Sequence, residues 1–105
     1  MSALTPRGST RRWRRIRRFV LDRSIERHGA QVCEYPVAGG RICGAPATDA
    51  DHIIPRKLWP AGRPGVDHPD NLRAACVRHN RRAGALLRAG RDPNTPPFPH
   101  YRLEV

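Results

Sequence analysis

The chain has 105 residues, 38% of them hydrophobic, with two Trp, two Tyr and two Phe, so one small domain with a marginal core is expected. Its formal net charge is +11, and this excess of positive charge indicates a polyanionic partner. All but one of its 20 Lys and Arg residues are Arg; a GC-rich genome would favour Arg over Lys but does not explain the net charge. The sequence has neither the roughly 20 apolar residues of a membrane span nor the apolar segment of a secretory signal, so we expect a cytoplasmic protein with no membrane partner.

Residues 1–29 are expected to form a basic N-terminal arm and helix. The first eight residues combine Pro and Gly with little apolar content, which predicts disorder. Thr10 and the serine before it can cap a helix over residues 10–28. Apolar side chains recur at helical spacing from Trp13 onward, and Gly29 is suited to end the helix.

The same helix carries arginines on its other faces, where like charges repel each other unless a partner neutralises them. DNA phosphates would do so, with release of counterions at each contact. The alternative is a solvated face on a helix that packs through Trp13 and Ile16. We favour DNA contact because the charge excess is one-sided. The residues expected to make it are Arg14, Arg15, Arg17 and Arg18.

Cys33 and Cys43 lie in the segment 30–46, which a proline and a Gly-Gly pair can fold back on itself. Zinc-bound thiolates lie roughly 4 Å apart, and a folded-back loop allows that separation. Cys-x9-Cys is not the usual Cys-x2-Cys zinc spacing, and two buried free thiols would explain this pair nearly as well. The chain has three cysteines, and an odd number argues against a closed disulfide framework.

The second half of the chain reads as strand, loop, strand, helix and tail. Residues 47–55 are a short strand candidate, and residues 71–75 can return as its partner. The loop 56–70 between them is long for a small domain, which usually indicates function. Residues 76–89 read as a helix, and the Pro-rich residues 91–105 as an extended C-terminal tail.

Three segments follow in an informative order: Asp51-His52-Ile53-Ile54-Pro55, then Asn71-Leu72, then Cys76-Val77-Arg78-His79-Asn80. In that order they resemble the HNH nuclease family, over about residues 31–84. The likeness is greatest to small HNH proteins of phages and actinobacteria. It implies a small zinc-stabilised α+β domain of the ββα-metal (HNH) type over residues 30–90, preceded by the basic helix and followed by the extended tail.

The resemblance also implies residue roles. His52 corresponds to the general base, because neutral imidazole can take a proton from water near pH 7. Asp51 corresponds to the acid that binds a divalent cation, and Asn71 to the asparagine that orients the histidine-bearing strand. Asn80 stands nine residues after Asn71, at the position of the family's final histidine. Oxygen ligands from Asp51 and Asn80 suit Mg²⁺ or Mn²⁺ as the catalytic ion.

A structural zinc site is implied as well. The commonest family pattern ends in Cys-x-x-Cys-His, and here His79 takes the place of the second cysteine. The implied ligands are Cys33, Cys43, Cys76 and His79, a Cys₃His set known from structural zinc sites. The family often has Lys three residues after the last metal ligand, where this chain has Ala83. Phosphate contact would then pass to Arg78, Arg81 or Arg82.

These features favour a metal-dependent DNA endonuclease of the HNH type, which nicks or cuts both strands and binds the phosphate backbone with low sequence specificity. The resemblance fits a phage packaging or terminase-type partner, and the host cytoplasm if the protein is phage-encoded. The alternative is a non-catalytic, zinc-stabilised DNA-binding module, and a basic RNA-associated zinc protein is a third reading. Neither alternative requires Asp51, His52 and Asn80 around one point.

Overall fold

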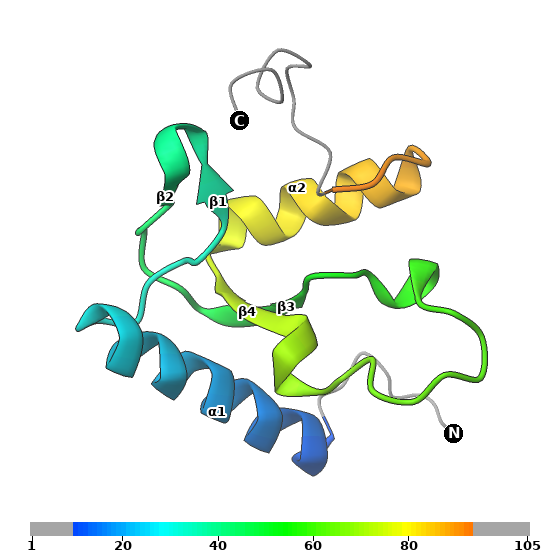
Figure 1. The fold of residues 1–105 in the computed structure, drawn as a ribbon, viewed down its shortest axis with the longest axis horizontal. Helices are drawn as coiled ribbons and strands as arrows, with labels where there is room; N and C mark the ends of the chain where they lie inside the picture. The colour runs from blue at the N-terminus through cyan, green and yellow to red at the C-terminus, as the bar shows by residue number, and fades with distance from the viewer. Residues whose placement is uncertain (1–9, 94–105) are drawn as a thin grey trace.

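A computed structural model describes residues 10–93, which form an α+β fold with two α-helices and two small antiparallel sheets (Figure 1). The helices and strands are α1 (Arg11–His28), β1 (Pro36–Val37), β2 (Arg41–Ile42), β3 (Asp49–His52), β4 (Leu72–Ala75) and α2 (Val77–Arg88). The β3–β4 sheet lies between the two helices. The predicted disorder of residues 1–8, and the predicted tail beyond residue 93, lie outside the described residues.

The predicted basic helix is present as α1 and begins one residue later than expected. Thr10 is its N-cap, and its hydroxyl oxygen accepts a hydrogen bond from the Trp13 N–H at 2.9 Å. Gly29 ends the helix at a φ of 82°, a left-handed conformation that favours glycine. In the described part of the chain, no helix is long and apolar enough to cross a membrane.

β3 and β4 pair in antiparallel register, with His52 opposite Leu72. All four residues of β4 are buried, so the strand forms the centre of the molecule. β3 is shorter than the predicted strand 47–55. The ladder stops after His52 because the next residue opposite, Asn71, belongs to a 3₁₀ turn and donates its N–H to the His68 carbonyl at 2.8 Å, although its own carbonyl still accepts from the Ile53 N–H.

The core has two halves of different composition. The first, between α1 and the β3–β4 sheet, contains Val20, Leu21, Ala47, Ala50, Leu72 and Ala74, with Trp13 and Ile16 packed against it. The second contains Cys33, Tyr35, Ala75, Cys76 and Ala83, with Cys43 and Ala45 packed against it. The second half has no large aliphatic side chain, so apolar burial alone stabilises it weakly, and a bound metal would add the missing stability.

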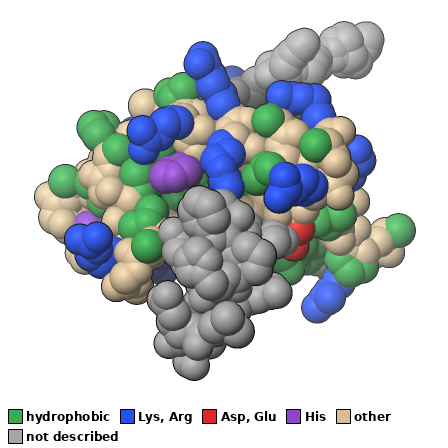
Figure 2. Space-filling view, turned by 90° about the horizontal axis from the view of Figure 1, so that it is seen from above, with side chains coloured by type: hydrophobic (Ala, Val, Ile, Leu, Met, Phe, Trp, Pro, Cys, Tyr) green, Lys and Arg blue, Asp and Glu red, His purple; other side chains and the backbone are tan. Residues whose placement is uncertain are grey.

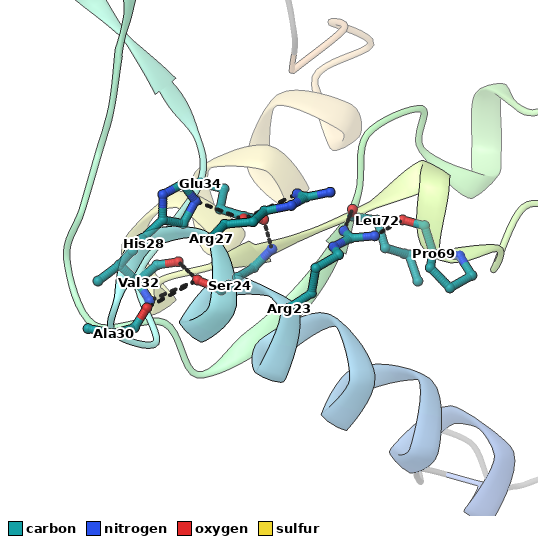
Figure 3. A network of polar contacts seen from close by, with 10 residues as sticks. Arg23, Ser24, Arg27, His28, Ala30, Val32, Glu34, Pro69 and Leu72 are labelled. Atoms are coloured by element: carbon teal, nitrogen blue, oxygen red, sulfur yellow. Dashed lines mark hydrogen bonds and ion pairs between the residues drawn. The ribbon is translucent and has the colours of Figure 1, made fainter.

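Glu34 joins α1 to β4 (Figure 3). Its backbone N–H donates to the Ala74 carbonyl at 2.9 Å, and its Oε1 accepts from the Ala74 N–H at 3.1 Å. Its Oε2 lies 3.4 Å from Arg27 Nη1 and 3.1 Å from His28 Nε2, both in the last turn of α1. The carboxylate thereby continues the hydrogen bonding of β4 and neutralises one arginine of α1.

Two further side chains of α1 fix the helix to the body of the protein (Figure 3). Arg23 donates to the carbonyl oxygens of Pro69 at 3.1 Å and Leu72 at 2.7 Å. Ser24 is fully buried, and its hydroxyl donates to the Val32 carbonyl at 2.8 Å and accepts from the Val32 N–H at 3.1 Å. The position of α1 against the sheet is therefore set by polar contacts as well as by apolar packing.

The loop 56–70 is more structured than predicted. It contains 3₁₀ turns over Arg56–Leu58 and Pro69–Asn71, and the second is capped by His68 Nδ1, which accepts from the Asp70 N–H at 3.0 Å. Prolines and short-range contacts of this kind restrict the loop without forming regular structure.

Candidate functional site

The predicted set Cys33, Cys43, Cys76 and His79 comes together in the structure. One ligand atom from each lies within 4.8 Å of all the others. His79 Nδ1 is 3.5 Å from Cys33 Sγ and 3.4 Å from Cys76 Sγ. Tetrahedral bonding to zinc at about 2.3 Å for sulfur and 2.0–2.1 Å for nitrogen would separate such atoms by roughly 3.5 Å. The cluster can therefore hold a metal such as zinc with little movement.

The fold brings these ligands together from two segments. The β1–β2 hairpin turns through Gly39 and Gly40, both at positive φ, and returns the chain so that the Cys43 N–H donates to the Tyr35 carbonyl at 2.8 Å. On the other side, Cys76 is the N-cap of α2 and its Sγ accepts from the His79 N–H at 3.4 Å. α2 therefore begins at residue 77, one residue later than predicted.

The pKa values of His79, Cys33 and Cys76 in the cluster are all shifted. Burial lowers the pKa of His79, and the nearby Arg78 and Arg82 lower it further, which favours the neutral imidazole that binds metals. Burial raises the pKa of the Cys33 thiol to about 11. For Cys76 burial also acts to raise the pKa, but hydrogen bonds from His79 and from the other thiols outweigh it and the pKa is lowered. A metal would displace the remaining thiol protons on binding.

A cavity of about 440 Å³ lies beside this cluster and contains most of the predicted catalytic residues. Asp51 and His52 reach it from β3, and Asn80 reaches it from α2. The residues lining it are Asp51, His52, Pro55, Arg56, Lys57, Asn80, Ala83, Gly84, Leu87 and Pro93. The cavity thus brings together a carboxylate, an imidazole and an amide, with two cations at its edge.

Asp51 is held by two neighbours. The Tyr35 hydroxyl donates to Asp51 Oδ2 at 2.6 Å, and Arg73 Nη2 lies 4.0 Å from the same oxygen. Burial raises the pKa of Asp51, while Tyr35 and Arg73 partly oppose that shift. Tyr35 also stacks on His79, with ring centroids 4.8 Å apart, so one side chain contacts both a residue of the Cys₃His cluster and a residue that lines the cavity.

His52 is oriented by two residues that the sequence analysis missed. Its ring stacks on Trp13 of α1, with centroids 5.6 Å apart and an interplanar angle of 17°. Its Nε2 lies 2.8 Å from Oδ1 of Asp67 in the loop 56–70. The sequence identified Trp13 only as a packing residue. An acid in a loop rich in Arg and Lys was the signal that could have pointed to Asp67.

Asn71 lies behind the cavity, not in its lining. Its side chain is buried, and its Nδ2 donates to the carbonyls of Ile54 at 3.1 Å and Val66 at 2.9 Å. Its Oδ1 accepts from the Ile54 N–H at 2.9 Å. These bonds fix the backbone immediately after His52.

The predicted DNA-contacting arginines occupy two helices. On α1, Arg18 is bonded to Asp22 at 3.0 Å and to Gln31 at 2.8 Å. Arg15 borders a second cavity of about 540 Å³ together with Arg12. On α2 the three predicted residues Arg78, Arg81 and Arg82 are all exposed.

The face that carries α2 is rich in cations. Figure 2 views it and shows Lys and Arg side chains spread over the coloured surface, with little acidic surface among them. Arg56 and Lys57 add two cations among the residues that line the cavity.

Comparison with protein-family models, with curated proteins and with solved structures finds no match to this chain. The resemblance to HNH nucleases therefore rests on the ordered sequence motif alone.

Proposed function

We propose that this protein is a metal-dependent DNA endonuclease of the HNH type, in which β3, β4 and α2 form the ββα-metal unit. The observation that carries the proposal is that Asp51, His52 and Asn80, from two separate elements, line one cavity. Lys57 at the same cavity suits an anionic substrate such as the phosphodiester backbone, and Arg56, whose Nη2 also bonds to Asp67 at 2.7 Å, adds positive charge there.

In this proposal His52 accepts a proton from the attacking water, and Asn71 holds the strand end that carries it. Asp51 and Asn80 offer oxygen donors, the type that Mg²⁺ and Mn²⁺ prefer. Such an ion, when bound, would supply neutralisation of the charge that develops on the phosphate. The bond from Tyr35 to Asp51 Oδ2 fixes the carboxylate for that role.

The metal proposed for the Cys₃His cluster is zinc, in a structural role, because all four protein positions are filled and none is left open for substrate. The partner proposed for the basic surface is duplex DNA, recognised through its phosphates with little sequence preference. The proposed location is the cytoplasm, that of the host if the protein is phage-encoded, where a packaging or terminase-type complex would be the partner.

One observation favours the second candidate, a non-catalytic zinc-stabilised DNA-binding module. Asp51 is buried and bonded to Tyr35, with Arg73 nearby, an arrangement that would also serve a purely structural carboxylate. The two functions differ in what they require of Asp51, since only the nuclease needs it to bind a metal.

Plasmid cleavage in Mg²⁺, in Mn²⁺ and in EDTA tests the proposal. Asp51→Asn keeps an acceptor for the Tyr35 hydroxyl but weakens the metal site, so cleavage should fall and recover in part at high Mg²⁺ by mass action. Asp49→Asn, on the same strand but not lining the cavity, is the charge-matched control and should cleave like the wild type. A wild-type protein that binds DNA but cleaves it in no metal would favour the binding module.

A further inference from the structure

Asp67 is the one carboxylate of the described chain that contacts His52. It lies in the loop 56–70, and the resemblance to HNH nucleases assigns it no role. Its side chain is 16% exposed and that of His52 is 19% exposed, so their contact at 2.8 Å is largely shielded from water. A shielded bond between an imidazole and a carboxylate is stronger and better oriented than an exposed one.

Two arginines hold the Asp67 carboxylate in place. Arg56 Nη2 donates to Oδ1 at 2.7 Å, and Arg12 Nη1 of α1 lies 3.7 Å from Oδ2. Burial alone would raise the pKa of Asp67, but the bonds from His52 and Arg56 outweigh it and the pKa is lowered. Asp67 is therefore ionised at neutral pH and can act only as an acceptor toward His52.

The contact decides which nitrogen of His52 carries the proton. A carboxylate that accepts from Nε2 requires the hydrogen to be on Nε2, and in neutral imidazole the lone pair is then on Nδ1. Trp13 stacks on a ring face at 5.6 Å and restricts rotation of the ring. With Nε2 engaged and a face covered, Nδ1 is the nitrogen left to accept a proton.

We propose that Asp67 is a positioning residue that holds His52 in its Nε2–H tautomer and so directs Nδ1 toward the attacking water. The inference rests on the proposed nuclease function for its catalytic meaning. Its claim about His52 itself can be tested without cleavage. Arg12 and Arg56 contribute to this positioning, since their contacts hold the Asp67 carboxylate against the His52 imidazole.

Two measurements test Asp67. The first is ¹⁵N NMR of histidine-labelled protein at pH 8, with the His52 signals assigned by their absence from His52→Ala. The wild type should show the Nε2–H tautomer, and Asp67→Ala should show a mixture. Asp70→Ala, which removes the same charge from an exposed residue three positions away, should leave the His52 tautomer unchanged. An unchanged tautomer in Asp67→Ala would overturn the proposal.

The second measurement is steady-state cleavage. Asp67→Asn should lower kcat by roughly 10–100-fold, as loss of such orienting partners does elsewhere, with little change in KM. Asp67→Glu should recover part of the loss, while Asp70→Asn should match the wild type. Equal kcat in Asp67→Asn and Asp70→Asn would overturn the catalytic part. A wild type that cleaves nothing contradicts the proposed nuclease instead, and the NMR result then decides the tautomer claim alone.

Discussion

Tyr35 and Asn71 show how single residues support the site without supplying its chemistry. The Tyr35 ring stacks on His79 of the metal cluster and its hydroxyl bonds to Asp51, which links the two candidate metal sites through one side chain. Burial and Asp51 together raise the pKa of Tyr35 to about 12, so it stays a hydrogen-bond donor over the working pH range. Asn71 makes three side-chain hydrogen bonds to the backbone of Ile54 and Val66.

Asn71 and Asn80 form a matched pair for a prediction at this scale. Asn71→Ala removes three part-buried hydrogen bonds to the backbone of Ile54 and Val66, each worth about 0.5–1.5 kcal/mol, so the free energy of unfolding should fall by about 1 kcal/mol or more. Asn80→Ala, at the cavity, should lower cleavage and leave stability nearly unchanged. Urea unfolding and cleavage rates on both variants check this, and equal stability losses would contradict it.

At the scale of elements, α1 both packs against the β3–β4 sheet and contacts the candidate site. It was predicted as a basic helix, and that prediction of its position holds to within one residue because its cap and its stop are local signals. Its contacts to the site, through Trp13 and Arg12, depend on the angle at which it crosses the sheet. That angle is set by Arg23, Ser24 and other long-range contacts, which no local pattern encodes.

Salt dependence tests whether α1 also binds DNA. Each phosphate contact contributes about −0.9 to the slope of log affinity against log salt. Replacing Arg14, Arg15, Arg17 and Arg18 with Gln should flatten the slope by a few units. The same salt dependence measured on a variant with Arg78, Arg81 and Arg82 of α2 replaced by Gln gives the comparison. An unchanged slope in the α1 variant would mean that α1 faces away from DNA.

At the scale of the whole molecule, the sequence predicted the strand–loop–strand–helix order and the Cys₃His set. Cys33 and Cys43 were the weaker half of that set, and only the β1–β2 hairpin places them beside Cys76 and His79. The contact of Asp67 with His52 spans 15 residues of loop with no periodicity to follow, so its only signal in the sequence was an acid among basic loop residues.

The metal should hold the second half of the core together. We expect one zinc per chain, and its removal by a chelator should unfold the protein, since zinc supplies on the order of 10 kcal/mol in small domains of this kind. Cys76→Ser should lose both zinc and the cooperative thermal transition. Elemental analysis and thermal unfolding check this. Chelated protein to which zinc is added back is the control and should regain the thermal transition. A chelated protein with an unchanged melting temperature would contradict the structural role.

The central claim is that His52 is the base of a nuclease, and comparing His52→Ala with His68→Ala tests it most directly. His68 lies in the loop 56–70 and does not line the cavity that holds Asp51, His52 and Asn80, so its loss controls for removing a histidine. A general base typically contributes 10²–10⁴-fold in rate, so His52→Ala should lose cleavage by about that factor and still bind DNA. His68→Ala should cleave DNA and bind it as the wild type does. Cleavage by His52→Ala at the wild-type rate would contradict the account.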